Sequence, residues 1–147
     1  MKPLLTTLLL TVAAISCRSI ETPPGYLPLE TFGELTYVAV APNGNRIEIR
    51  EHDNREEGTA EYWAQAIQRE LVEGRGYSLE SNQSRLLHTG TTFHELLFST
   101  EHQLREYLYL VAIYASSGEV QILEAGGERE SLEPDLPVIR QMLDTID

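Results

Sequence analysis

Apolar and polar residues alternate along several short segments of the chain, which is the pattern of half-buried β-strands. In Arg46–Glu51, Ile47 and Ile49 lie on one side of the segment and charged residues lie on the other. The segment before it, Leu35–Ala41, is rich in β-branched and aromatic residues. The Pro42–Asn45 turn between the two contains Asn-Gly, a strong hairpin signal. We therefore predict an antiparallel hairpin.

Two other segments show the spacing of three and four residues that marks an amphipathic helix. The first begins after Thr59, a favourable N-cap residue, and ends at Gly74 and Gly76. Its apolar stripe consists of Ala60, Trp63, Ala64, Ile67 and Leu71. The second begins at about Asp135, an N-cap candidate, with Pro137 in its first turn. Its stripe consists of Leu136, Ile139, Met142, Leu143 and Ile146.

Between the helices the pattern returns to strands joined by short turns, which make consecutive strands antiparallel neighbours. The predicted strands are Tyr77–Ser81, Arg85–His88, Thr91–Ser99, Arg105–Ala115 and Glu119–Ala125, and Gly126–Pro134 is predicted to be a loop. Arg105–Ala115 is apolar on both faces, with Tyr107 and Tyr109 on one and Tyr114 on the other. Such a strand belongs in the middle of a sheet.

This order of elements predicts an α+β domain, with an antiparallel sheet (hairpin, helix, meander, C-terminal helix) and two helices packed on one face. The opposite face is apolar enough to need cover. Cover would come from the Tyr26–Phe32 segment, from a partner or from a small apolar ligand. Tyr107, Tyr109 and Tyr114 are therefore the candidate residues of a partner or ligand face. Trp63 is expected in the core, since a large side chain on a buried stripe fills the interior.

The first residues of the chain follow another pattern. Lys2 precedes Leu4–Ser16, a run of thirteen mostly apolar residues. A membrane span needs about 20 apolar residues, whereas the apolar region of a secretory signal is shorter. Residues 1–16 are therefore predicted to be a signal peptide.

The end of this run, Ala14-Ile15-Ser16-Cys17, resembles the lipobox of bacterial lipoprotein precursors, although alanine stands at position 14 where leucine is usual. The resemblance implies that Cys17 is acylated, palmitate included, and anchors the protein in the lipid bilayer of the cell envelope. Because no aspartate follows the cysteine, it also implies the outer membrane, facing the periplasm, rather than the inner membrane. Two alternatives stay open: cleavage near Ala13 or Ser16 that leaves Cys17 as a free thiol, or an uncleaved anchor.

Residues 17–29 are expected to form the lipid-anchored N-terminus and a Pro-rich tether, because Ser19–Leu29 contains three prolines and a glycine. In the alternative, Tyr26 and Leu29 pack onto the domain. Residues 30–147 are then the single α+β domain.

Composition and charge exclude several classes of function. Without the signal peptide, ten arginines face 23 acidic residues, a net charge of −13, and such a surface repels nucleic acid. Cys17 is the only cysteine, so no internal disulfide forms. The only lysine, Lys2, belongs to the signal peptide, which excludes Schiff-base chemistry.

The order of elements resembles the PsbP-like superfamily, whose fold occurs in extrinsic subunits of photosystem II, in a Ran-binding nuclear import factor and in DcrB-type lipoproteins of bacterial envelopes. The matching segments are "TAEYWAQAIQREL", "GYSLESNQSRLLHTGTTFHELLFST", "LREYLYLVAIYASSGEVQILEAGG" and "LPVIRQMLDTI". The resemblance covers Leu35 to Ile146 and brings no shared catalytic residues. A fold alone does not assign a function.

The sequence contains no pattern typical of an active site. The histidines show no H-E-x-x-H or H-x-H spacing, so no metal site is expected. Nucleophile motifs and phosphate loops are missing as well, so we expect neither an enzyme nor a cofactor. The sequence therefore predicts a lipoprotein that acts as a non-catalytic interaction or accessory module with an envelope protein as partner. A module that binds a small ligand or a cation is the alternative.

Overall fold

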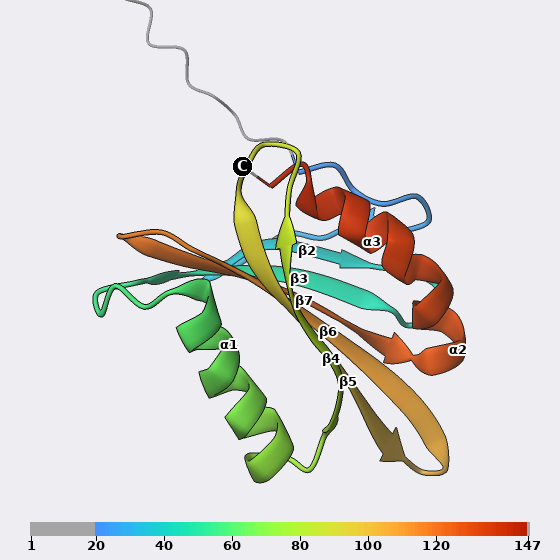
Figure 1. Cartoon of the computed structure of the whole chain (residues 1–147). Helices are drawn as coiled ribbons and strands as arrows, with labels where there is room; N and C mark the ends of the chain where they lie inside the picture. The colour runs from blue at the N-terminus through green and yellow to red at the C-terminus, as the bar shows by residue number, and fades with distance from the viewer. Residues whose placement is uncertain (1–19, 147) are drawn as a thin grey trace, which may run out of the picture.

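A seven-stranded antiparallel sheet forms the centre of the computed structural model, which describes residues 20–146 (Figure 1). The predicted signal peptide and Cys17 lie outside the described residues. The strands are β1 (Leu27–Pro28), β2 (Leu35–Val40), β3 (Arg46–Asp53), β4 (Ser78–Leu86), β5 (Thr92–His102), β6 (Arg105–Ala115) and β7 (Glu119–Glu128). Their order across the sheet is β1-β2-β3-β7-β6-β5-β4, so β3 and β7 join the N-terminal hairpin to the meander.

Within residues 20–146, three α-helices accompany the sheet. They are α1 (Ala60–Arg69), which ends in a π-helical turn (Glu70–Gly74), α2 (Arg129–Leu132) and α3 (Leu136–Leu143), with a 3-10 turn (Glu133–Asp135) between the last two. The predicted α+β class and the antiparallel meander are thus confirmed.

Local sequence signals account for the ends of these elements. Gly44 in the β2–β3 turn has a φ of +90°, a conformation that glycine adopts without strain. The side chain of Thr59 accepts a hydrogen bond from the Tyr62 N–H at 3.1 Å and caps α1. At the other end the Tyr77 N–H donates to the Leu71 carbonyl at 2.9 Å, and Gly76 has a φ of +74°. This arrangement is a Schellman motif.

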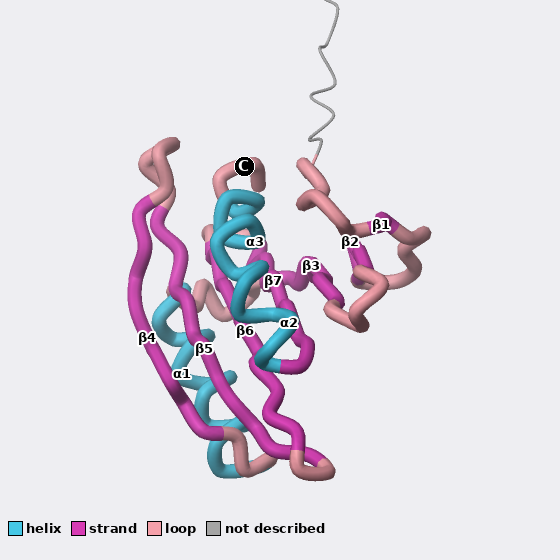
Figure 2. Tube along the Cα trace, turned by 90° about the vertical axis from the view of Figure 1, so that its right-hand side faces the viewer, coloured by secondary structure: helices cyan, strands magenta, loops and turns pink. Residues whose placement is uncertain are grey.

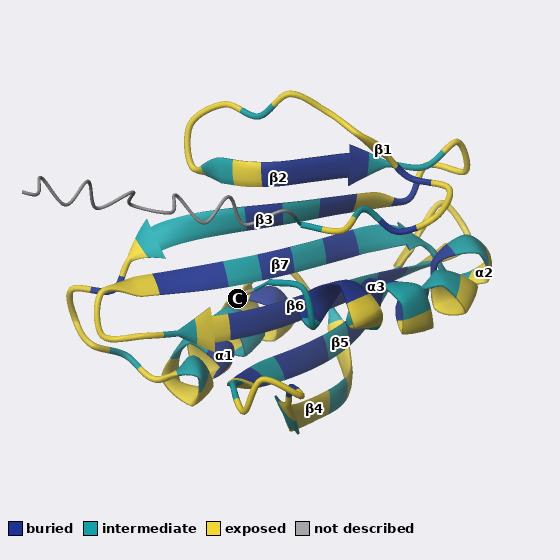
Figure 3. Ribbon diagram, turned by 90° about the horizontal axis from the view of Figure 1, so that it is seen from above, coloured by how far each residue is buried: buried dark blue, intermediate teal, exposed yellow. Residues whose placement is uncertain are grey.

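The prediction that both helices pack on one face of the sheet is wrong. α1 packs on one face and α3 packs on the other, as Figures 1 and 2 show. The reason lies in the side chains of β6. Leu108 and Leu110 belong to the buried apolar cluster that contains Ile139 of α3, which we call the α3 cluster. Val111 and Ile113 belong to the cluster that contains Ala64 of α1, which we call the α1 cluster. Because this strand is apolar on both faces, each face of the sheet needs a helix that removes it from water. Figure 3 shows that the buried residues of the sheet are concentrated in the strands between β1 and β4, the two edge strands.

The prediction that Gly126–Pro134 is a loop is also wrong. β7 continues through Gly126 and Gly127 to Glu128, and α2 begins directly afterwards. A Cβ atom at position 127 would lie 2.0 Å from Oδ1 of Asn45, a fully buried side chain, so glycine is required there for close approach. Gly127 therefore marks a crowded position in a strand.

The predicted strands Tyr77–Ser81 and Arg85–His88 are a single strand, β4. A bulge between Leu79 and Ser81 shifts its pairing with β5 without ending the strand. β5 likewise continues beyond the predicted Ser99 to His102, whereas β6 has the predicted bounds, and the turn between them is centred on Gln103 and Leu104, both with positive φ. Two positive φ values match the twist of a tight hairpin, which lets the strands continue to the turn.

A buried ion pair holds α3 against the sheet. Glu95 on β5 is fully buried, and Arg140 on α3 donates to its carboxylate from Nη2 at 2.7 Å and from Nε at 3.1 and 3.2 Å. Gln83 adds a hydrogen bond at 3.2 Å. Charge-assisted pairs of this geometry are directional, so Glu95 fixes where α3 crosses the sheet.

Part of the predicted tether lies against the domain. Ile20 packs on the α3 cluster, the Tyr37 hydroxyl donates to Thr22 Oγ1 at 3.0 Å, and the buried Tyr26 donates to Asp135 Oδ2 at 2.8 Å. We call residues 20–28 the N-terminal strap. Of the two residues expected to pack onto the domain in the alternative to a free tether, Tyr26 is buried, whereas Leu29 is 43% exposed.

Candidate functional site

An open part of the sheet lies beside α1. This helix packs mainly on β5 and β6 and reaches Val120 and Ile122 at the start of β7, and the charged part of β7 and β3 beside it forms the floor of a hollow. The hollow has a volume of about 770 Å³ and lies between α1 and these two strands. We call it the α1 trough. Its wall is formed by Trp63, Ala66, Ile67 and Ile122, and its floor by Arg46, Glu48, Arg50, Tyr109 and Glu124.

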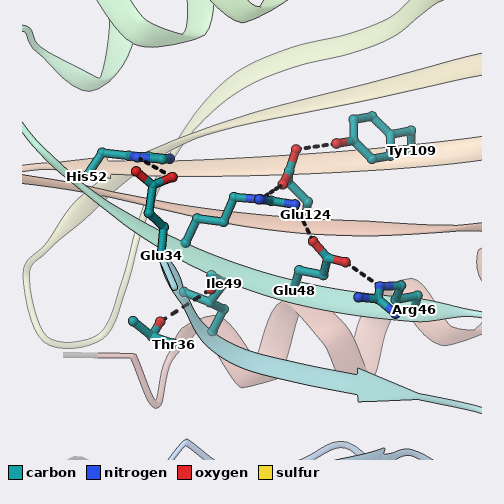
Figure 4. A network of polar contacts seen from close by, with 9 residues as sticks. Glu34, Thr36, Arg46, Glu48, Ile49, His52, Tyr109 and Glu124 are labelled. Carbon is teal, nitrogen blue, oxygen red and sulfur yellow. Dashed lines mark hydrogen bonds and ion pairs between the residues drawn. The ribbon is translucent and has the colours of Figure 1, made fainter. Parts of the chain in front are cut away.

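The floor is a continuous chain of charged hydrogen bonds (Figure 4). The Tyr109 hydroxyl and Arg50 Nε both donate to Glu124, the latter at 2.9 Å. Arg50 Nη2 also donates to Glu48 at 2.6 Å, and Glu48 accepts from Arg46 Nε with its other oxygen. Each of the four oxygens of these two carboxylates therefore accepts a hydrogen bond from the protein.

Strand register explains why these residues meet. Glu48 on β3 lies directly opposite Glu124 on β7, and like charges in that position repel each other. Arg50 follows Glu48 by two residues, so its side chain emerges on the same face. By donating to both carboxylates at once, Arg50 converts a repulsive pair into an attractive cluster.

Glycine leaves room in the trough. Gly126 lies between Tyr109 on β6 and Arg46 on β3 in the register of the sheet. A Cβ atom at Gly126 would lie 3.4 Å from Cδ2 of Tyr109, so the tyrosine ring rests on the glycine. The hollow continues past Gly126 into a second one of about 560 Å³, which Tyr77 and Tyr107 line.

Trp63 forms the wall of the trough as well as part of the core. It packs against the α1 cluster but is only partly buried. Only part of its side chain therefore lies in the core, where the sequence places all of it. Its indole N–H donates to Oδ1 of Asn54 at 3.1 Å. Asn54 is buried and also donates to the Ser116 carbonyl at 2.6 Å. Trp63 is therefore held in one orientation beside the trough.

The three tyrosines predicted from sequence do not share one site. Tyr107 and Tyr109 lie on the α1 face and line the two hollows, as the alternation along β6 indicates. Tyr114 lies on the opposite face, 38% exposed, beside Leu143 and Ile146 at the end of α3. The structure therefore brings two of the predicted residues together and separates the third.

The charged residues of the floor are not predicted from the sequence to form a site. Arg46, Glu48 and Arg50 lie on the polar side of a half-buried strand, which is the ordinary position for charged residues. β3 is an inner strand of the sheet, where the polar side has strands on both flanks. A signal was present in principle, because three alternating charges on a non-edge strand indicate a face that is open to a ligand or a partner.

The histidines are spread over the structure. His52 lies 3.4 Å from Glu34, His88 lies 3.4 Å from Asp144, and His94 hydrogen-bonds to Asn82. Within residues 20–146 no three His, Cys, Asp or Glu side chains are grouped closely enough to hold a metal ion. None of the helices described between these residues is long and apolar enough to cross a membrane.

Comparison with known proteins gives the fold. No family model and no curated protein matches the chain. The solution structure of cyanobacterial PsbP (CyanoP) from Synechocystis sp. PCC 6803 is similar, with a TM-score of 0.57 over 93% of this chain and 96% of that one, at 10% identity. The chain has a PsbP-like fold.

A second similar structure is that of PA94 from Pseudomonas aeruginosa, a protein of unknown function. It matches with a TM-score of 0.53 at 15% identity and covers 86% of this chain and 84% of its own. At such identities the likeness concerns the fold alone, so the predicted PsbP-like fold is confirmed, and membership of the superfamily and of its DcrB-type group stays an expectation.

We expect Arg50→Ala to lower the free energy of unfolding by about 1–2 kcal/mol, because Glu48 and Glu124 then face each other without a shared donor. Urea denaturation measures this change. Glu48→Gln removes the repulsion, so Arg50→Ala should cost less in that background. Arg55→Ala, which removes an arginine from an exposed loop pair, is the control. Equal losses for Arg50→Ala in the two backgrounds would contradict the proposed role of Arg50.

Tyr109 should titrate late. Burial, followed by the nearby charge of Glu124, raises the pKa of Tyr109 well above its ordinary value of 10.0. The raised pKa means that the folded state holds the proton more tightly, so this contribution to stability is present below pH 10 and is lost as the pH rises further. An ultraviolet titration of tyrosine ionisation checks this. Tyr109→Phe should remove one late-titrating group, and loss of an early one instead would contradict the expectation.

Proposed function

We propose that this protein is a lipid-anchored lipoprotein of the bacterial cell envelope whose PsbP-like domain is a non-catalytic accessory module. The observation that carries the proposal is the closeness of the anchor to the domain. Cys17 would hold the acyl chains, and the N-terminal strap begins at Ile20. Three residues span at most about 10 Å, so the domain would lie directly on the membrane surface.

The strap supports this arrangement mechanically. Ile20 packs on the α3 cluster, the Glu21 N–H donates to Thr145 Oγ1 at 3.3 Å, and β1 pairs with β2. A pull on the N-terminus would therefore act on α3 and on the sheet together. A flexible tether would leave the domain free to turn, whereas a packed strap keeps one end of the domain beside the bilayer.

A non-catalytic role agrees with the state of the carboxylates in the α1 trough. A general base needs a carboxylate that can accept a proton from a substrate. Glu48 and Glu124 instead accept hydrogen bonds from arginine and tyrosine on every oxygen. These groups are arranged to hold the floor rigid and to present the remaining arginine N–H groups.

The partner protein would bind at the outer edge of the sheet that carries the strap. Leu27 and Phe32 are 65% and 78% exposed there, next to the short edge strand β1. Exposed apolar side chains close to an anchor are placed to meet another envelope protein. The β5–β6 turn, at the end away from the strap in Figures 1 and 2, carries the similarly exposed Leu104 and provides a matched control.

A second candidate function is the binding of a small ligand. The α1 trough favours it, because an open hollow with an apolar wall and a polar floor is the usual form of a ligand site. The two functions are compatible, since the trough and the outer edge are on different parts of the sheet.

We expect Cys17→Ser to abolish incorporation of labelled palmitate and to move the protein from the membrane to the soluble fraction. Two acyl chains give lasting attachment, whereas the apolar surface of the domain alone does not. Labelling and fractionation of cells that produce each form measure both effects. Ser19→Thr, which leaves the lipobox and its cysteine unchanged, serves as the control. Retention of Cys17→Ser in the membrane would overturn the anchor.

The partner is sought by affinity capture of the full chain from detergent-solubilised envelope, followed by mass spectrometry. A specific partner should be captured by the unchanged protein and by Leu104→Ser, and should be lost or reduced about tenfold with Phe32→Ser. Capture by all three forms alike would place the contact elsewhere and contradict the proposed edge.

A further inference from the structure

We infer that the α1 trough binds a small amphipathic molecule with a single negative charge, such as an aromatic carboxylate or sulfonate. The inference rests on the ligand-binding function proposed above and names the chemistry of its ligand. It follows from which hydrogen-bonding groups of the floor are still free, from the balance of positive and negative charges on the floor and from the apolar residues of the wall.

The free groups of the floor are donors. A guanidinium donates from Nε, Nη1 and Nη2. Among the described residues Arg46 donates from Nε alone and Arg50 from Nε and Nη2, so both retain Nη groups for a ligand. Glu48 and Glu124 already accept a bond on each oxygen. A ligand that completes the floor therefore brings an acceptor, and a planar carboxylate or a sulfonate fits the arginine fork.

The charge of the floor limits the ligand to one negative charge. Arg46 and Arg50 carry two positive charges, and Glu48 and Glu124 carry two negative charges a few ångströms away. The ion pair of Arg75 and Glu70, which lines the same hollow, adds one charge of each sign. A singly charged head group can lie on the outer side of Arg46 and use its free N–H groups. A phosphate dianion would double both its attraction to the arginines and its repulsion from the carboxylates, but the cost of removing it from water grows with the square of its charge, so a single charge is favoured.

The net charge of the chain, −12, does not oppose this assignment. At physiological ionic strength the field of exposed charges falls off over about 8 Å. A ligand in the trough therefore responds mainly to the arginines that it touches. The distant acidic residues lower the rate of arrival more than the affinity.

The wall selects an apolar body. Trp63 is fixed by its hydrogen bond to Asn54, and Ile67 and Ile122 flank the same hollow. Trp63 is held beside Asn54, just past the C-terminal end of β3, whereas Arg46 is the first residue of that strand. A small aromatic ring that reaches the arginines therefore packs against Ala66 and Ile67, further along α1 in the same hollow.

The test compares two probes of nearly the same shape, naphthalene-2-sulfonate and the neutral naphthalene-2-sulfonamide. Each is titrated into the full chain by isothermal calorimetry, with detergent blanks, and the fluorescence of Trp63, the only tryptophan, is recorded in parallel. The sulfonate should bind to one saturable site and change the Trp63 emission. It should bind at least about tenfold more tightly than the sulfonamide, the factor expected for charge-assisted hydrogen bonds.

Variants then locate the site. Arg46→Gln should weaken the sulfonate about tenfold and leave the sulfonamide unchanged, since Arg46 is a surface residue that pairs only with Glu48. Arg55→Gln, outside the trough, should change neither. Ala66→Phe, at an exposed position of α1 that faces the hollow, should block both probes without touching the arginines.

The outcomes separate the two levels of the proposal. Equal affinities for the sulfonate and the sulfonamide, both lost in Ala66→Phe, would overturn the anionic class and keep a ligand site. Absence of saturable binding by either probe would overturn the ligand-binding function and this inference together. Unchanged sulfonate binding in Arg46→Gln would likewise overturn the inference. Palmitate labelling of Cys17 is independent of all three results.

Discussion

The arrangement of this protein depends on a single constraint, the burial of β6 on both faces. Leu108 and Leu110 point to one side of that strand and Val111 and Ile113 to the other, and all four are almost fully buried. Apolar area of this size must be removed from water on each side for the fold to be stable. One helix per face satisfies the requirement, and the sheet thus becomes the middle of three layers.

The same constraint creates the open site. α1 covers β5, β6 and the start of β7, where the apolar residues of its face lie, and leaves the charged part of β7 and β3 open. The charged side chains of this open part are tolerated because Arg50 joins Glu48 and Glu124 in one cluster. A polar floor beside an apolar helix is therefore a by-product of covering a wide sheet with a short helix. That combination suits the recognition of amphipathic molecules.

The PsbP-like fold supplies a scaffold and leaves its use open. The similar structures share 10% and 15% of their residues with this chain, so the charged floor, Trp63 and the strap are read from this protein alone. The strap changes the picture of the N-terminus most. A Pro-rich segment that suggested a spacer is packed through Tyr26 and Thr22, and an anchor at Cys17 would then hold the domain on the membrane surface.

The sequence by itself determined the type of most elements, since hairpin, α1 stripe and α3 stripe follow from periods of two and of 3.6 residues and from local caps. It also determined that Tyr107 and Tyr109 share a face, because alternation along one strand is a local property. Only the tertiary structure decided which face each helix covers. An apolar stripe indicates that one side of a helix is buried, but it does not indicate which surface that side packs against.

The pairing of β3 with β7 was likewise a tertiary decision, and with it came the meeting of Glu48 and Glu124 across about 75 residues of chain. The role of Gly127 depended on Asn45, another partner far away in sequence. In each of these cases the physical cause is a contact between residues that are distant in sequence. Local patterns show which residues are suited to such contacts, and only the assembled sheet shows which of them meet.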